Sequence, residues 1–119
     1  MFLTLCKSKI NRVTITQAEL HYNGSITIDS LLMDAARLRP YERVQVLNLN
    51  NGERLETYVI EGEAGSGTIC LNGPAARSGV VGDIVTIISY ATMDEKEADG
   101  WQPVVVWVDR NNKIVDCRA

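Results

Sequence analysis

Apolar and polar residues alternate in many short runs along the chain, and glycine, proline or asparagine separates most of these runs. Such alternation is typical of β-strands that bury one face. The pattern predicts strands over residues 2–6, 12–16, 20–22, 25–28, 42–49, 54–60, 68–71, 84–90, 103–108 and 114–116. Strands this short and numerous, without internal repeats, predict a small closed β architecture.

Two or three short helices are also expected. Asp29 is a favourable N-cap, and the apolar positions that follow it keep helical spacing until Pro40 stops them. Residues 94–98 give a second helical signal. After Asn72, Pro74 is suited to the first turn of a third helix. The expected fold class is therefore mainly β.

Two asparagine–glycine signals predict tight turns. Residues 50–52 are expected to join the strands on either side in one hairpin, and Asn23-Gly24 to do the same in another. In the strand after residues 50–52, alternation places Arg54 and Tyr58 on one face and Thr57 on the other. A bulge would be needed for Thr57 to reach the same site as the other two.

Size and charge limit the possible classes of protein. A length of 119 residues predicts a single domain, residues 1–119. The 12 basic and 15 acidic side chains give a net charge of −3 without a basic block, which argues against a nucleic-acid partner. The N-terminal run becomes charged too early for a signal peptide, and no apolar run approaches membrane-spanning length. A cytoplasmic location and no membrane partner are expected.

The sequence lacks the residues that the most common catalytic centres require. The cysteines Cys6, Cys70 and Cys117 lie far apart without C-x-x-C spacing, so we expect reduced, mostly buried thiols. His21 is the only histidine, which leaves no ligand set for a metal. It also weakens a serine-hydrolase interpretation, because no nucleophile-elbow pattern surrounds His21 or Ser25. The glycines form neither a phosphate-binding loop nor a dinucleotide fingerprint.

The pair Gly24-Ser25 offers a different chemistry. If the Gly24 carbonyl is held out of its usual plane, the Ser25 hydroxyl can attack it and move the acyl group from nitrogen to oxygen. Elimination across that ester, followed by hydrolysis, would leave a carboxylate on Gly24 and a pyruvoyl group at residue 25. A pyruvoyl ketone condenses with an amine and withdraws electrons, which favours amino-acid decarboxylation. From these residues alone, a plain turn is the simpler interpretation.

Further motifs accompany this pair. They are Tyr22-x-Gly24-Ser25, Asn51-Gly52 before Arg54, Thr57-Tyr58, Asn72-Gly73 with Ala75-Ala76, Gly82-Asp83 and the run Ser89-Tyr90-Ala91-Thr92-Met93. In register from residue 7 to about residue 108, they resemble the bacterial aspartate 1-decarboxylases. The resemblance implies a closed six-stranded double-psi β-barrel that assembles as a homotetramer, with active sites between neighbouring subunits.

The resemblance also implies an activity. The precursor would cleave itself into residues 1–24 and 25–119, and the second fragment would begin with a pyruvoyl group made from Ser25. This covalent group would be the cofactor, with neither a metal nor pyridoxal phosphate. L-Aspartate would be converted through a Schiff base to β-alanine and CO2, a carboxy-lyase reaction of pantothenate biosynthesis. The sequence does not show whether cleavage needs a maturation partner.

Roles for individual residues follow from the same resemblance. Thr57 would hydrogen-bond the Gly24 carbonyl during cleavage, and Tyr58 would donate the proton that replaces the departing carboxylate. The substrate would be bound by Lys9, Arg54, Thr57, Asn72, Gly73 and Ala75. These roles make physical sense, because two carboxylates call for two cations and a tyrosine is protonated at neutral pH.

Two positions depart from the family pattern. Asn11 stands where these enzymes commonly carry histidine, and Pro74 replaces an alanine and has no backbone N–H. Two alternatives stay open at this point. One is a pyruvoyl decarboxylase of glutamate or another amino acid, and the other is an uncleaved, noncatalytic β-barrel module in which Asn23-Gly24-Ser25 is only a turn.

Overall fold

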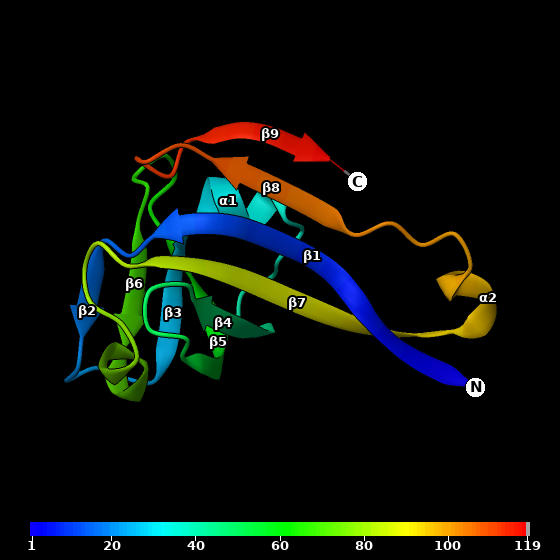
Figure 1. The fold of residues 1–119 in the computed structure, drawn as a ribbon, viewed down its shortest axis with the longest axis horizontal. Helices are drawn as coiled ribbons and strands as arrows, with labels where there is room; N and C mark the ends of the chain where they lie inside the picture. Colours follow the sequence, from blue (N-terminus) through cyan, green and yellow to red (C-terminus); the bar gives the residue numbers. More distant parts are fainter. Residues whose placement is uncertain (119) are drawn as a thin grey trace.

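The computed structural model describes residues 1–118, which fold mainly into β-strands with three short helices (Figure 1). The helices are α1 (Ser30–Ala35), the 3-10 helix η1 (Gly73–Arg77) and α2 (Glu95–Ala98). The strands are β1 (Phe2–Thr14), β2 (Gln17–Glu19), β3 (Ser25–Asp29), β4 (Arg43–Asn48), β5 (Arg54–Gly62), β6 (Ile69–Asn72), β7 (Ile84–Asp94), β8 (Val104–Val108) and β9 (Ile114–Arg118). The mainly β class is confirmed.

The strands form one hydrogen-bonded series in the order β2-β6-β3-β5-β4-β7-β1-β8-β9. Three pairs in this series are parallel, namely β1 with β8, β2 with β6 and β3 with β5. Residues 1–118 form nine strands, one fewer than the ten that the pattern predicted and more than the six of the implied barrel. Within the same residues the series also has two ends, at the short strand β2 and at β9, so its pairing pattern is not the closed ring that was expected.

One predicted hairpin is confirmed and the other is wrong. Strands β4 and β5 pair as antiparallel neighbours around residues 50–52, and Gly52 in that turn has a φ of +76°. No hairpin forms at Asn23-Gly24, because β2 and β3 both pair with β6, which lies between them. The β4–β5 register is regular throughout, so β5 has no bulge at Thr57 that would bring it to the face of Arg54 and Tyr58.

Strand β1 is one long element where the pattern predicted two strands and a polar corner. It pairs with β7 from Phe2 to Thr14, and irregularities in the register mark the expected corner between Cys6 and Ser8. Ser8 continues the strand by pairing with Ser89, and its buried hydroxyl hydrogen-bonds that of Ser89 at 2.8 Å. Figure 1 shows β1, β7 and β8 running side by side along the long axis of a molecule of 43 × 28 × 25 Å.

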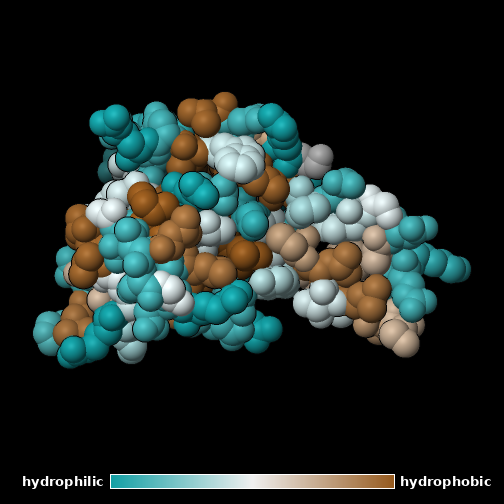
Figure 2. Space-filling view, viewed as in Figure 1, coloured by the Kyte–Doolittle hydropathy of each residue, from teal (hydrophilic) through white to brown (hydrophobic). Residues whose placement is uncertain are grey.

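The core collects the inward residues of these strands together with one face of α1. Burial of this apolar surface is the main favourable contribution to folding. Its largest fully buried side chains are Ile10, Val13, Ile15, Ile26, Ile28, Leu32, Met33, Val44, Val46, Ile69, Leu71 and Ile87. Apolar residues also reach the surface, where Figure 2 shows them interspersed with hydrophilic ones. Exposed examples are Phe2, Val80, Val81 and Val115.

The three cysteines are all free thiols, but they differ in burial. Cys70 is buried, Cys6 is half-buried and Cys117 is exposed. The expectation of mostly buried thiols is therefore wrong for Cys117, which lies on the edge strand β9. No helix formed by residues 1–118 is long and apolar enough to cross a membrane.

Asp29 ends β3 and caps α1, as predicted, although the helix stops at Ala35, earlier than expected. Its carboxylate accepts backbone N–H bonds from Leu31 at 2.9 Å, Gly65 at 3.0 Å and Gly67 at 2.8 Å. Burial alone would raise the pKa of Asp29, but these three donors outweigh burial and hold the pKa below its ordinary value. The ionised carboxylate therefore ties the loop before β6 to the start of α1.

Replacing this carboxylate should destabilise the fold in a pH-dependent manner. In Asp29→Asn the amide NH2 faces a backbone donor, so the free energy of unfolding should fall by about 1–3 kcal/mol at pH 7. The pKa of Asp29 is lower in the folded protein than the unfolded value of about 4, so its carboxylate stabilises the folded state above that pH. This stabilisation disappears as the pH falls through the pKa of the folded state. Urea unfolding should therefore show the gap to the parent protein closing below about pH 4.

Asp34→Asn is a matched control, because Asp34 is an exposed carboxylate in the same helix. It should leave stability within about 0.5 kcal/mol of the parent at every pH. An Asp29→Asn gap that did not change with pH would contradict this account of the carboxylate.

Candidate active site

Ser25 is the first residue of β3, and the sheet rather than the preceding turn determines its position. It pairs with Asn72 on β6, and its side chain is almost fully buried, at 1% exposure. Its Oγ accepts a hydrogen bond from Asn72 Nδ2 at 2.9 Å and donates a longer one to the Asn23 carbonyl at 3.4 Å. A hydroxyl is thus held, out of solvent, against the main chain that precedes it.

Gly73 closes this arrangement from the β6 side. Its φ is +63°, and a Cβ at this position would lie 2.6 Å from the Tyr22 carbonyl oxygen and 2.9 Å from the Gly24 nitrogen. Any larger residue would push against backbone, which cannot yield as a flexible side chain does. The close approach of these two main chains holds the segment before Ser25 in one place.

A cavity of about 480 Å³ opens beside Gly24, and Ser25 is not among the described residues that line it. The structure brings four of the predicted residues to it, namely Gly24, Thr57, Tyr58 and Ala75. The remaining lining residues are Leu55, Glu56, Pro74 and Ser78. Sequence reasoning missed Leu55, Glu56 and Ser78 as lining residues, because nothing in their type or spacing distinguishes them from ordinary strand and turn residues.

Thr57 and Tyr58 reach the cavity from opposite faces of β5. Thr57 pairs with the buried Val44, whereas Tyr58 pairs with the exposed Arg43. No side-chain hydrogen bond within residues 1–118 joins Thr57 to Gly24, although both line the cavity. Tyr58 is 37% exposed, and its ring lies 6.2 Å from the ring of Tyr41, at an angle of 40°. Tyr58 is therefore partly open to solvent where it lines the cavity.

The predicted cation Lys9 lies on the outer face of the sheet. Cross-strand partners on this face follow one another from Glu56 on β5 to Gln45 on β4, Ile88 on β7 and Lys9 on β1. Arg54 shares the face, because it is two residues from Glu56 along β5. Opposite it stand Leu47 and, one strand further, Thr86. The two cations thus belong to one surface of the chain.

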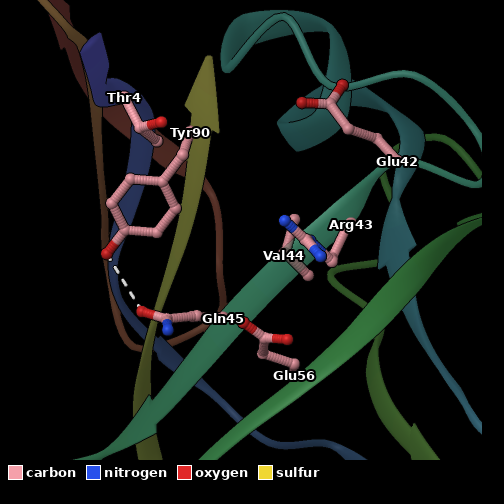
Figure 3. Close-up of a pocket in the computed structure, with 7 residues that line it drawn as sticks. All are labelled: Thr4, Glu42, Arg43, Val44, Gln45, Glu56 and Tyr90. Carbon is pink, nitrogen blue, oxygen red and sulfur yellow. Dashed lines mark hydrogen bonds between the residues drawn. The ribbon is translucent and has the colours of Figure 1, made fainter. Parts of the chain in front are cut away.

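Figure 3 shows a second cavity on this outer face, of about 460 Å³. Tyr90 on β7 reaches across to β4, where its Oη donates to Gln45 Oε1 at 3.0 Å. Arg43 and Glu56 line the same cavity, and Glu56 also lines the first one. The outer face is therefore polar and charged where it adjoins the Gly24 cavity.

A single chain does not bring its two cations to Ser25. Neither Lys9 nor Arg54 lines the Gly24 cavity in residues 1–118. Four strand spacings separate β1 from β3 in the sheet order, which is about 19 Å along a curved surface. Arg54 is four residues from Tyr58 along β5, or about 13 Å. Also within the described part of the chain, no group of three or more His, Cys, Asp or Glu side chains is placed to hold a metal ion.

Comparison with known proteins decides the family. The family profile described as aspartate decarboxylase matches residues 1–115. The chain belongs to the aspartate decarboxylase family. One relative, named aspartate 1-decarboxylase, from Cytophaga hutchinsonii, is 57% identical over 97% of this chain and 100% of its own length. Another with that name, from Carboxydothermus hydrogenoformans, is 62% identical over 97% of this chain and 91% of its own.

The fold is also found among solved structures. The crystal structure of a rationally designed double-psi β-barrel protein matches with a TM-score of 0.50, over 65% of this chain and 90% of the design. Its sequence is only 17% identical, so this likeness concerns the fold alone. It agrees with the double-psi β-barrel class that membership in the aspartate decarboxylase family had implied.

The close approach at Gly73 generates a prediction that separates steric clash from backbone strain. Gly73→Ala should lower the free energy of unfolding by about 3 kcal/mol or more and displace residues 22–24, because it adds a clash to an unfavourable φ. Gly52→Ala is the matched control, since Gly52 also has a positive φ but nothing lies within 4 Å of an added Cβ. Gly52→Ala should lower the free energy of unfolding by about 1 kcal/mol, from backbone strain alone.

Chemical denaturation gives both values, and intact mass spectrometry then follows any change at the Gly24-Ser25 bond over time. Equal destabilisation by the two substitutions would show that the contact between Gly73 and residues 22–24 does not constrain the chain.

Proposed function

We propose that this chain is the precursor of a pyruvoyl-dependent aspartate 1-decarboxylase, which converts L-aspartate to β-alanine and CO2 for pantothenate biosynthesis. The observation that carries the proposal is the buried Ser25 hydroxyl, held by Asn72 beside the main chain that it must attack. Membership in the aspartate decarboxylase family supports the same activity.

The position of Ser25 suits a self-cleaving bond. Because Ser25 is the first residue of β3, a break before it leaves every pairing of β3 with β5 and β6 in place. Residues 1–24 stay attached through the long ladder of β1 with β7 and its parallel pairing with β8. Cleavage into residues 1–24 and 25–119 is therefore compatible with one domain built from both fragments.

The residues around the bond fit the formation of a pyruvoyl group from Ser25. Asn72 Nδ2 already contacts the Oγ that must leave with Gly24, and Gly73 holds the Gly24 main chain from the other side. Thr57 lies on the cavity wall with Gly24, and we assign its hydroxyl the hydrogen bond to the Gly24 carbonyl during cleavage. When formed, the ketone supplies an electron sink for the amine of the substrate.

The wall of the cavity suits a small amino acid. Tyr58 lines the cavity, and we assign its hydroxyl the delivery of the proton that replaces the lost carboxylate. Ala75 of η1 lines the same cavity, and we assign Asn72 and Gly73, which adjoin Ser25 and Gly24, to substrate binding with it. Two cations are required for the two carboxylates of aspartate, and Lys9 and Arg54 meet that requirement as a flexible point charge and a planar fork.

These cations must come from another chain. Within one chain Lys9 is four strand spacings away from Ser25, far more than the length of aspartate. The outer face that carries both cations is open, so a neighbouring copy can present it to the Gly24 cavity. We therefore place each active site between two subunits of a homotetramer, which acts in the cytoplasm.

The first prediction concerns cleavage and its product. Intact mass spectrometry of the denatured protein should show two fragments divided at Gly24-Ser25, and Ser25→Ala should remain one chain of 119 residues. The cleaved protein should release β-alanine from aspartate. Ser30→Ala is a control on a serine outside the cavity and should cleave like the parent.

Two results would overturn parts of this proposal. Faster turnover of glutamate than of aspartate would make the chain a decarboxylase of the longer substrate, since one extra methylene displaces one carboxylate from its cation. An uncleaved chain that resists carbonyl reagents, even after incubation with cell extract, would make it a noncatalytic β-barrel module.

The second prediction tests the division of the site between chains. Lys9→Ala and Ser25→Ala should each be nearly inactive alone, the first without its cation and the second without its ketone. Co-expressed, they should regain about a quarter of the parent activity, because random assembly makes one site in four intact. A Lys9→Ala, Ser25→Ala double variant co-expressed with Lys9→Ala is the control and should regain none. No recovery in the first mixture would place both groups in one chain.

A further inference from the structure

Cys70 contacts Asn72, the hydrogen-bond partner of Ser25, and has no role in the proposed reaction as described above. Cys70 precedes Asn72 by two residues on β6, so both project from the same face of that strand. Cys70 is 4% exposed and Asn72 is 3% exposed. The Cys70 thiol donates to Asn72 Oδ1 at 3.2 Å, and Asn72 Nδ2 donates to Ser25 Oγ and Thr27 Oγ1, both at 2.9 Å.

The orientation of the Asn72 amide decides what Ser25 meets. Thr27 would tolerate the amide in either of its two orientations, because a hydroxyl either donates or accepts. Ser25 donates its own hydrogen to the Asn23 carbonyl at 3.4 Å and therefore accepts from the amide. The Cys70 thiol favours the same orientation from the other end of the amide, because an S–H donor on this side calls for the amide oxygen. The amide NH2 is then directed at Ser25 Oγ.

Burial keeps this thiol in its donor form. Removal from water raises the pKa of Cys70, and the negative charge of Glu19 raises it further. Glu19 lies on β2, whose parallel register with β6 sets it opposite Asn72. The sulfur therefore carries its proton at neutral pH, as the hydrogen bond to Oδ1 requires.

We propose that Cys70 is a positioning residue for the self-cleavage at Ser25, acting through the side chain of Asn72. The inference rests on the proposed function, since it concerns how the precursor matures. The step at issue is the elimination that follows the shift of the Gly24 acyl group to Oγ.

In that elimination the Cβ–Oγ bond of Ser25 breaks, and Oγ leaves with the bonding electrons as one oxygen of the Gly24 carboxylate. The Cα proton of Ser25 passes to water, and the electrons of the Cα–H bond form the Cα–Cβ double bond. Negative charge therefore grows on the very oxygen that Asn72 Nδ2 contacts. A donor at this place stabilises the charged oxygen more than the neutral ester, whereas a rotated amide would present its own oxygen and oppose the step.

The experiment compares two substitutions of Cys70 that differ in hydrogen bonding. Cys70→Ala removes the donor and should slow the appearance of the two fragments about tenfold. Cys70→Ser keeps an O–H donor and should stay within about threefold of the parent. Cys117→Ala, which changes an exposed thiol far along the chain, should cleave like the parent.

A second readout distinguishes positioning from general destabilisation. If elimination is the slowed step, the ester accumulates in Cys70→Ala, and hydroxylamine should cleave a larger share of that variant than of the parent. In an Asn72→Ala background, Cys70→Ala should cause no further slowing, since the side chain through which Cys70 acts is gone.

Three results would overturn the inference while leaving the proposed function intact. They are parent-like cleavage by Cys70→Ala, equal slowing by Cys70→Ala and Cys70→Ser, and additive slowing in the Asn72→Ala background. Absence of cleavage in the parent protein itself would instead contradict the proposed function.

Discussion

The antiparallel ladder between β3 and β6 is the constraint on which the rest of the site depends. It sets Ser25 opposite Asn72, a residue 47 positions away in the sequence. Backbone hydrogen bonds of a sheet are far less mobile than a surface turn, so the Ser25 hydroxyl is positioned by long-range structure. Gly73, the next residue after Asn72, lies so close to residues 22–24 that a Cβ at this position would clash with their main chain. The end of β6 thus supplies a polar partner for Ser25 and a close backbone contact for the residues before it.

The same ladder explains why the sequence predicted some elements and missed others. Local signals were sufficient where the partners are near in sequence, as for the Asp29 cap, the β4–β5 hairpin and the start of η1 at Pro74. The Asn23-Gly24 signal failed because a distant strand, β6, takes the place between β2 and β3 that a hairpin partner would occupy. Hairpin statistics describe neighbours along the chain and carry no information on such an insertion.

Prediction of the site had a similar limit. The motifs identified Gly24, Thr57, Tyr58 and Ala75, which the structure brings to one cavity. They identified Lys9 as well, but its distance from Ser25 depends on the order of the five strands from β1 to β3, and no sequence motif specifies that order. The sequence predicts only a reduced thiol at Cys70, because its link through Asn72 to Ser25 becomes apparent only when β6 is seen beside β3. The sequence was sufficient to identify candidate residues by type, whereas the order and pairing of the strands were needed to tell which of them lie together.

The two departures from the family pattern fall where the fold tolerates them. Pro74 occupies the first turn of η1, where a backbone N–H has no partner within the helix, so its loss does not weaken η1. Its ring instead lies 3.5 Å from where a Cβ on Gly24 would be, and it narrows the cavity beside the scissile bond. Asn11 accepts a hydrogen bond from Thr86 at 3.4 Å on the face that carries both cations. An amide cannot change its charge with pH as a histidine would, so Asn11 adds no titratable charge to this face.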